Sequence, residues 1–332
     1  MKKLLLLATG GTIASKKMEN GLSPQLSSEE ILSYLPEEAR LANIETRQIL
    51  NIDSTNIQPE DWTFMAEVIQ KAYDNYDGFI ITHGTDTMAY TAAALSYLIQ
   101  NPGKPIVLTG SQKPISDDIT DARKNLADSL RFACEGQAAG VYIVFDGKAI
   151  LGTRARKVRS KSYSAFESIN YPAAAFIDGR RVIHYTAGAS PKAEPEFSLH
   201  LNPRVFLLKL IPGMEPDILD YISDQYDAVI IESYGVGGIP FYGKRNFLEK
   251  LKNLTQKGKI AVIATQVMLE GSDAEIYEVG SQALRQYNVL QAYDMTVEAA
   301  VVKLMWIMAE TRDYEKVREK FYTCIHHDIL TE

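Results

Sequence analysis

LLLLATGGT, residues 4–12, is a short apolar run that ends in threonine and glycine, and FIITHGTDT, residues 79–87, has the same pattern. Unbroken apolar runs of this kind are typical of strands in a parallel sheet that is covered on both faces. In such sheets, ligands bind in the crevice beyond the carboxyl ends of the strands. Both segments place hydroxyl side chains beside glycine at that position. They therefore predict an α/β fold with a binding site at the ends of two strands.

Short apolar runs alternate with amphipathic stretches along the rest of the chain. Runs rich in β-branched residues predict further strands at residues 45–49, 106–108, 141–145, 205–210, 228–231 and 260–264. Apolar residues at helical spacing predict a helix behind Pro59, one at 31–35 that Ser27 and Glu30 would cap, and others at 87–100, 122–133, 217–225, 245–256, 297–309 and 314–321. This alternation predicts a mainly parallel sheet flanked by helices.

The alternation stops between residues 186 and 203, where glycine, proline and charged residues show no period. We therefore predict a linker at residues 188–203. It separates a larger N-terminal domain, residues 1–187, which carries the threonine-rich motifs, from a smaller C-terminal parallel α/β domain, residues 204–332. Two domains are also expected from the length of 332 residues, because single hydrophobic cores stop growing at about 250–300 residues.

The composition of the chain indicates its cellular compartment and argues against some classes of partner. The formal net charge of −7 argues against nucleic acid or an anionic membrane surface as a partner. The only two cysteines, Cys134 and Cys324, are far apart and indicate reduced thiols. The opening MKKLLLLA imitates a secretory signal, but its apolar stretch stops after about five residues, where a signal needs about 7–15. No run approaches the ~18 apolar residues of a membrane-spanning helix. We expect a cytoplasmic protein with no membrane partner.

Two kinds of site lack support in the sequence. The five histidines show no metal-ligand spacing, and the adjacent His326 and His327 rarely serve one metal together. Gly10 and Gly11 are not followed by the third glycine of a dinucleotide fingerprint or by the Lys-Ser/Thr of a phosphate loop. We therefore expect no metal and no cofactor.

With metal and nucleotide sites unsupported, catalysis by a threonine hydroxyl is the remaining possibility. Thr12 would attack a carbonyl if a neighbouring group took its proton and backbone N–H groups of the glycine turn stabilised the oxyanion. Thr85 and Asp86 supply a hydroxyl and an anion, and a nearby lysine that offers a neutral amine would complete a relay. The basic run at residues 154–161 contains candidates, but spacing alone does not choose between its lysines and arginines.

Each of these segments alone also has an ordinary structural interpretation. The 9–12 and 82–87 segments suit tight turns between a strand and a helix, and the basic run suits a solvated surface strand. Only their occurrence together favours catalysis.

The motifs in their order resemble those of the bacterial-type L-asparaginases, and among these the cytoplasmic type I branch. The resemblance runs nearly from end to end of the chain. The segments that carry it are residues 8–14, 51–56, 81–91, 108–112, 152–157, 166–170 and 233–238.

The resemblance implies a catalytic set and a reaction. Thr12 corresponds to the nucleophile, and Thr85, Asp86 and Lys157 correspond to the second catalytic threonine with its aspartate and lysine partners. The implied reaction is hydrolysis of L-asparagine to L-aspartate and ammonia through a covalent acyl-enzyme, with direct attack by water as the alternative.

The resemblance also implies a substrate clamp. Asp53, Ser54 and Thr55 fall where the family holds the α-groups of the amino acid, with the serine near the α-carboxylate, and Thr85 and Asp86 contribute as well, the aspartate beside the α-ammonium. Clamping both charges would position the amide carbon against the nucleophile. Glutamine is one methylene longer, which is typically worth ~1–3 kcal/mol, so we expect at most weak glutaminase activity.

Three positions bear on finer properties of the family. Leu22 stands where family members often place a catalytic tyrosine, and Lys16 and Lys17 lie close to it in sequence. Val267 and Glu232 stand where some type I members use a cysteine and an arginine to bind a second, regulatory asparagine, so we expect hyperbolic kinetics. The family forms homodimers or homotetramers in which one copy of the chain completes the site of another, and the turn at residues 235–238 is our candidate for that contribution.

Three other functions remain open. An asparaginase-like subunit of a tRNA-dependent amidotransferase resembles this fold but usually carries an additional N-terminal domain, whereas this chain starts directly at its first strand. A silent amino-acid sensor would keep the clamp and lack turnover, as the missing tyrosine hints. A nucleotide-binding oxidoreductase would require a phosphate loop that the sequence does not show.

Overall fold

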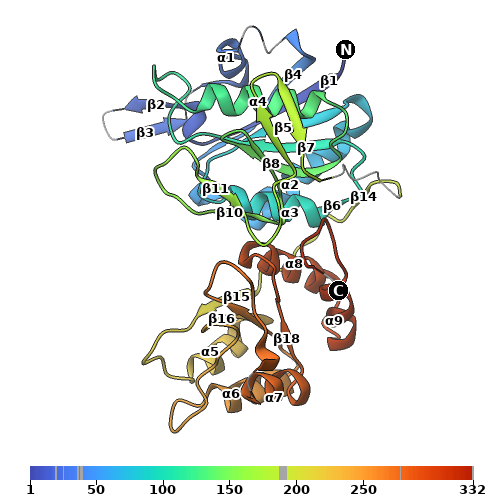
Figure 1. Ribbon diagram of the computed structural model, residues 1–332. Helices are drawn as coiled ribbons and strands as arrows, with labels where there is room; N and C mark the ends of the chain where they lie inside the picture. Colours follow the sequence, from blue (N-terminus) through green and yellow to red (C-terminus); the bar gives the residue numbers. More distant parts are fainter. Residues whose placement is uncertain are drawn as a thin grey trace. The chain divides into compact units, whose positions relative to one another are not determined.

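The chain divides into two compact units, Met1–Leu199 and His200–Glu332, each built around its own sheet (Figure 1). The computed structural model describes residues 1–18, 21–24, 26–35, 37, 40–186, 193–276 and 278–330. Both units alternate strands with helices, as the sequence predicts. The two-domain α/β prediction is therefore confirmed.

The first unit contains a sheet of eight strands. Five neighbouring strands are parallel and include every strand predicted for this half of the chain. In their order across the sheet they are β4 (Asn43–Ile52), β1 (Lys3–Gly10), β5 (Gly78–Thr82), β7 (Pro105–Thr109) and β8 (Gly140–Phe145). Three antiparallel strands, which the sequence patterns did not predict, continue the sheet beyond β8: β9 (Lys148–Leu151), β12 (Ala175–Asp178) and β13 (Arg181–His184).

Helices cover both faces of this sheet. Figure 1 shows α1 (Ser28–Ser33) and α4 (Ala122–Cys134) on one face and α2 (Pro59–Ala72) and α3 (Met88–Leu98) on the other. Strands β1, β5 and β7 alternate their apolar side chains between these layers, and Leu4, Leu6 and Ile80 pack on the α1 and α4 side. The capping box of Ser27 and Glu30 is present at the start of α1. The helices predicted for this unit are thus observed.

Three short antiparallel pairs lie outside the main sheet in the described part of this unit, and one of them, β10 (Ala155–Lys157) with β11 (Phe166–Ser168), belongs to the candidate site. Helix α3 ends two residues earlier than predicted because β6 (Ile99–Gln100) pairs with β14 (Glu196–Phe197). The pairing brings residues 193–199 of the predicted linker into the first unit, while residues 187–192 lie outside the described residues. The third pair joins β2 (Ser15–Met18) and β3 (Gly21–Pro24), with Lys17 opposite Leu22. The side chains of Lys16, Lys17 and Leu22 are not among those described.

The second unit contains a parallel sheet of four strands with helices on both faces. The core beneath α5 to α7 contains Val229, Ile231, Leu251 and Ile263. The sheet order is β15 (Val205–Lys209), β16 (Ala228–Ser233), β17 (Ile260–Thr265) and β18 (Val289–Gln291), and the helices are α5 (Ile218–Gln225), α6 (Phe247–Gln256), α7 (Glu278–Gln286), α8 (Val297–Glu310) and α9 (Tyr314–Tyr322). Strand β18 and helix α7, which contains Gly280, were not predicted from the sequence.

Within the described part of the chain, no helix has both the length and the apolar character needed to span a membrane. The short 3-10 helices that matter for the site are η1 (Thr12–Ala14) and η3 (Ser54–Asn56). Each follows directly on the end of a strand of the first sheet.

Candidate active site

The threonine-rich segments meet where the strand order of the first sheet reverses. Strand β1 lies between β4 and β5, so the chain leaves β1 toward one side of the sheet and later returns on the other. Ala8 of β1 is in register with Gln48 of β4 and with Thr82 of β5. The turns after all three strands therefore lie at one edge of the sheet. A crevice outside such a switch point is where open α/β sheets bind their ligands.

Glycine permits close packing of these turns. A Cβ atom on Gly11, whose φ is 78°, would lie 2.5 Å from the Cα atom of Gly84. A Cβ atom on Gly84 would lie 2.5 Å from the Ser54 Oγ atom. The backbone amide of Gly11 also donates to the Ile52 carbonyl at 3.2 Å. The turns that carry Thr12, Ser54 and Thr85 are thus in direct contact, with no space for a side chain between them.

Lys157 joins this cluster from a different part of the chain. Its Nζ atom donates to the Thr85 Oγ1 atom and to the Asp86 Oδ1 atom, each at 2.7 Å. Thr85 is buried, Lys157 is mostly buried, and the Asp86 side chain is 56% exposed. The three groups form a cation, a hydroxyl and a carboxylate in hydrogen-bond contact at the rim of the crevice. One of the three, the carboxylate, remains open to a ligand.

The basic side chains of residues 154–161 have different surroundings, because part of this segment forms a strand of a hairpin. Residues Ala155–Lys157 form β10, which pairs antiparallel with β11 (Phe166–Ser168). Lys157 projects to the Thr85 turn, whereas Arg154 is completely buried, with its guanidinium 5.5 Å from the ring centre of Tyr171. Of the candidates that spacing left open, Lys157 is therefore the one in contact with Thr85 and Asp86.

Thr12 is the first residue of η1 and is half-buried. The Gly11 carbonyl just before it accepts from the Ser15 hydroxyl at 2.9 Å, which holds the turn closed. The Thr9 hydroxyl donates to the Thr82 carbonyl at 2.9 Å and ties the ends of β1 and β5 together. These bonds, with the contact between Gly11 and Gly84, set the Thr12 turn beside that of Thr85.

The three predicted clamp residues behave differently from one another. Ser54 is buried, and its hydroxyl accepts from the backbone amide of Asp86 at 3.3 Å while its carbonyl accepts from the Thr87 hydroxyl at 2.7 Å. The amide and hydroxyl of Thr55 both donate to the Asp53 Oδ1 atom at 2.9 Å. Ser54 is thus joined to the Asp86 turn, whereas Asp53 and Thr55 cap their own 3-10 helix at the exposed side of the crevice.

Gln112 is a site residue to which the sequence patterns assigned no role. Its Oε1 atom accepts from the Thr85 hydroxyl at 3.4 Å, and its Nε2 atom donates to the Ser162 carbonyl at 3.1 Å. Its backbone amide donates to the buried carboxylate of Asp121, whose pKa is raised by burial. Part of the signal was present in the sequence, because Gln112 follows the end of a predicted strand.

His83 lies beneath the site and not within the crevice. It is completely buried, and loss of water lowers its pKa to about 4. Its Nδ1 atom is 2.6 Å from the Gly84 carbonyl oxygen and its Nε2 atom is 2.9 Å from the Thr91 Oγ1 atom. The ring is therefore neutral at pH 7, and its hydrogen bonds are to other parts of the protein interior. No group of side chains able to hold a metal ion occurs among the described residues.

The second unit holds the residues that the resemblance relates to regulation and assembly. Glu232 is buried on β16, and Val267 is half exposed in the turn after β17. The predicted turn at 235–238 is closed by a bridge between Tyr234 and Gly238. All of these lie at the carboxyl end of the second sheet.

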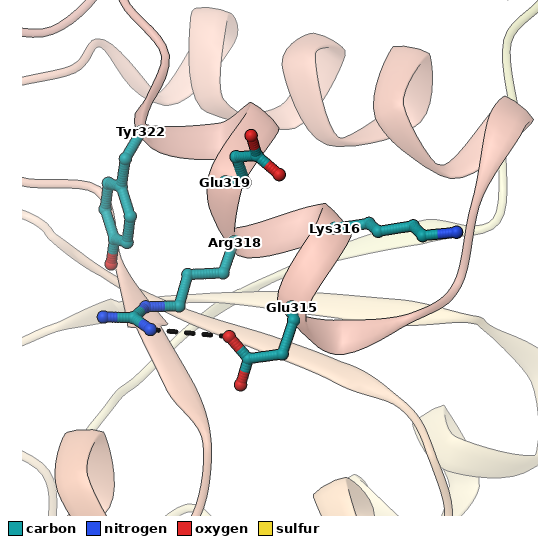
Figure 2. Close-up of a pocket in the computed structure, with 5 residues that line it drawn as sticks. All are labelled: Glu315, Lys316, Arg318, Glu319 and Tyr322. Atoms are coloured by element: carbon teal, nitrogen blue, oxygen red, sulfur yellow. Dashed lines mark ion pairs between the residues drawn. The ribbon is translucent and has the colours of Figure 1, made fainter.

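Two surface cavities contain none of the predicted site residues. The first, of about 340 Å³, lies on α9, where Arg318 and Glu315 are 3.5 Å apart and Lys316 points away from the other labelled side chains (Figure 2). The second, of about 510 Å³, lies between the end of α4 and β13 and includes Arg131, Cys134 and Arg181. The residues that the sequence analysis assigned to the site meet instead at the ends of β1, β4 and β5, which are therefore the candidate active site.

Two family models account for most of the chain. The model "Asparaginase, N-terminal" matches residues 3–189, and the model "Glutaminase/Asparaginase C-terminal domain" matches residues 204–321. The chain belongs to the asparaginase family. The resemblance that the motifs indicate is thereby confirmed.

Relatives agree with the family assignment over most or all of their length. The L-asparaginase of Thermococcus kodakarensis is 46% identical over 318 residues, 96% of each chain. Its solved structure superposes with a TM-score of 0.94 at 44% identity, covering 99% of this chain and 100% of that one. L-asparaginase I of Vibrio cholerae superposes with a TM-score of 0.89 at 31% identity over 99% of both chains. A glutamyl-tRNA(Gln) amidotransferase subunit of Metallosphaera sedula is 34% identical over 97% of this chain and 75% of that protein.

Proposed function

We propose that the protein is an amidohydrolase that converts L-asparagine to L-aspartate and ammonia. The observation that carries the proposal is the pair of 2.7 Å contacts from the Lys157 Nζ atom to Thr85 and Asp86, beside the turn that bears Thr12. Membership in the asparaginase family supports it, as does the extent of identity to a relative named L-asparaginase. The proposed catalytic residues are Thr12, Thr85, Asp86 and Lys157.

The relay suits nucleophilic attack by a threonine hydroxyl. The Thr12 oxygen would bond to the side-chain amide carbon of asparagine while its proton passes by way of Thr85 to the neutral amine form of Lys157. The carbon–nitrogen bond would then break, with the proton going to the amide nitrogen, which leaves as ammonia. Water would hydrolyse the ester on Thr12, release aspartate and restore the hydroxyl. Asp86 lies 2.7 Å from the Lys157 Nζ atom and holds the lysine beside Thr85.

The same site supports recognition of a small zwitterion. The exposed carboxylate of Asp86 is open to an α-ammonium group. The Ser54 hydroxyl, which accepts from the backbone amide of Asp86, would contact the α-carboxylate. Asp53 and Thr55 would form the exposed wall of this clamp. Holding both charges on one carbon determines where the amide carbon lies. Glutamine would place its amide carbon one methylene too far, so its turnover would be weak.

One alternative, a component of a tRNA-dependent amidotransferase, finds some support in the comparisons. Identity to the amidotransferase protein is 34%, against 46% for the L-asparaginase, and the chain spans 75% of the former but 96% of the latter. A component of that kind would work with a partner protein. Ammonia release from free asparagine by this chain alone therefore discriminates the two functions, and it also separates the enzyme from a silent amino-acid sensor.

The test is ammonia release by the purified protein with L-asparagine and with L-glutamine, beside two variants. We expect Thr12→Ala and Lys157→Met each to lower kcat for asparagine by about 100-fold or more, because each removes one participant in proton transfer. Lys161→Met is the matched control, since Lys161 is an exposed lysine of the same basic run. It should keep wild-type activity. Full activity in Thr12→Ala would refute the nucleophile assignment.

We also propose that the protein is a cytoplasmic homodimer or homotetramer. Two free cysteines in a chain of this length suit a reducing compartment. Exposed apolar side chains gather in the segments that follow β15, β16 and β17, at the carboxyl edge of the second sheet, and a second copy of the chain would cover them. They are Ile211, Phe241, Tyr242, Val267, Met268 and Leu269.

A further inference from the structure

A chain of hydrogen bonds runs from helix α2 to the turn that carries Thr85. The Trp62 Nε1 atom donates to the Thr91 Oγ1 atom on α3 at 2.9 Å, and that oxygen is 2.9 Å from the His83 Nε2 atom. The His83 Nδ1 atom is in turn 2.6 Å from the Gly84 carbonyl oxygen. Trp62, His83 and Thr91 are all buried. None of the three reaches the crevice, yet the series of hydrogen bonds ends at Gly84, one residue before Thr85.

The direction of every bond follows from the chemistry of the groups. A carbonyl oxygen only accepts, so the hydrogen of the neutral His83 ring is on Nδ1. Nε2 therefore presents a lone pair and accepts the Thr91 hydroxyl hydrogen. An indole N–H only donates, so the Thr91 oxygen accepts from Trp62. The Thr91 hydroxyl and the His83 ring thus each accept one hydrogen and donate one. Breaking any of these bonds would leave a buried donor or acceptor without a partner, which costs about 1–3 kcal/mol.

The last hydrogen bond of this series, from His83 to Gly84, controls the orientation of one peptide unit. The Gly84 carbonyl and the Thr85 amide belong to the same planar trans peptide and point in opposite directions. His83 holds the carbonyl against its buried ring, so the Thr85 N–H points away from that ring. Glycine permits many backbone conformations, so this unit needs an external restraint. The His83 amide, which donates to the Thr109 carbonyl at 2.8 Å, keeps the ring's own backbone in place.

We propose that His83, Thr91 and Trp62 act as positioning residues that hold the peptide between Gly84 and Thr85 in the orientation needed for turnover. This role rests on the proposed function, because the residue that it orients is the proposed catalytic Thr85. The three residues do not touch the substrate. They act through the carbonyl of Gly84, and a loss of the Thr91 hydroxyl removes the bond at Nε2 that keeps the His83 ring from turning.

The first test compares two substitutions at Thr91. Thr91→Val keeps the shape of the side chain and removes the hydroxyl, and we expect kcat for asparagine to fall about 10- to 100-fold as the catalytic geometry loosens. KM should change less than about 3-fold, because the clamp at Ser54 and Asp86 is untouched. Thr91→Ser retains the hydroxyl and should restore kcat to within about 3-fold of wild type. Wild-type kcat in a folded Thr91→Val would overturn the proposal.

The second test reads the hydrogen bonds without turnover. Nitrogen-15 NMR of the His83 ring in the wild-type protein at pH 7 should show the proton on Nδ1. Thr91→Val should leave it there but shift the Nε2 resonance, because Nε2 loses the hydroxyl hydrogen that it accepts. A proton on Nε2 in the wild type would overturn the proposal even if Thr91→Val fails to fold. Absence of asparagine turnover in the wild-type protein would instead refute the proposed function, so the two failures are distinguishable.

Discussion

At the scale of single side chains, the contacts of Lys157 distinguish it from the basic residues beside it in sequence. Arg154, Arg156 and Lys157 are close neighbours in sequence and carry the same charge, and Lys157 is the one whose Nζ atom bonds to both the Thr85 hydroxyl and the Asp86 carboxylate among the contacts described. A compact ammonium group on a flexible stem exchanges protons, whereas a guanidinium group stays charged. The residue at the end of β10 is therefore the one whose chemistry suits a relay.

The neutral state of His83 has a measurable consequence for stability at acid pH. The pKa of the ring is about 4 in the folded protein, and it returns to about 6.5 when the chain unfolds. Between these values the unfolded state binds a proton that the folded state does not, so stability falls as the pH is lowered. From pH 7 to pH 5 this group alone should lower the free energy of unfolding by about 2 kcal/mol.

Urea unfolding at pH 7 and pH 5 measures this loss. A Trp306→Phe background leaves Trp62 as the only tryptophan, so that its fluorescence reports the first unit. The comparison is with His83→Gln in the same background, which has no group that titrates at this position. Equal pH dependence of the two proteins would show that the ring is not held neutral.

Residues of the site differ in how far the sequence predicted them. Thr12, Ser54, Thr85 and Asp86 follow directly on strand ends, and local patterns of apolar residues and glycine indicate such positions. Gln112 also follows a strand end, but its bond to Thr85 depends on the neighbouring order of β5 and β7. That order is a property of long-range pairing and leaves no local trace in the sequence.

At the scale of helices and strands, the buried pair of Lys303 and Asp328 anchors the end of the second unit. Lys303 on α8 and Asp328 beyond α9 are both fully buried, with the Nζ and Oδ2 atoms 2.6 Å apart. Burial lowers the pKa of Lys303 against the opposing effect of Asp328. The Lys303 Nζ atom also donates to the Thr323 carbonyl at 2.8 Å, and the Ile325 amide donates to Asp328. The pair thus holds residues 323–328 against α8.

Removing one partner should be far more costly than removing both. Lys303→Met leaves a buried carboxylate without its cation, which typically costs about 3–5 kcal/mol. The double variant Lys303→Met with Asp328→Leu replaces the pair by apolar side chains and should recover most of that loss. Thermal unfolding of the two variants and the wild type checks this. A double variant no more stable than Lys303→Met would contradict the interpretation of the pair as an ionic anchor.

Elements that were missed share a physical cause. Strand β9 has only four residues and is joined to β8 by a turn in which Asp146 and Gly147 both have positive φ, the conformation that an Asp-Gly sequence favours. Helix α7 contains an internal glycine, which weakens the helical signal. Asp-Gly is a local signal for the turn, but a strand as short as β9 and a helix interrupted by glycine show little apolar period of their own, so their form depends on packing against neighbours.

At the scale of the whole molecule, the exposed apolar residues of the second sheet predict an assembly. We expect light scattering to give the mass of a dimer or a tetramer. Phe241→Asp combined with Leu269→Asp should lower that mass to a monomer, because charge on the apolar face opposes its burial. Asparaginase activity should fall in parallel if a neighbouring copy completes the site, as the family resemblance implies.

Tyr221→Asp is the matched control for this experiment, since Tyr221 is an exposed aromatic residue on α5 of the same unit. It should leave the mass unchanged. A wild-type protein that scatters as a monomer at micromolar concentration would refute the proposed assembly.

By itself, the sequence determined the class of fold and predicted the place of the candidate site. Apolar runs, helical spacing and glycine beside threonine are local patterns, and each depends on residues that are neighbours along the chain. Spacing left open which basic residue meets Thr85, the family resemblance implied Lys157, and the tertiary structure has that contact. Tertiary structure alone decided that Gln112 joins Thr85 and that His83 lies beneath it with a neutral ring. Those outcomes depend on strand order, hairpin register and burial, which arise only when segments distant in sequence pack together.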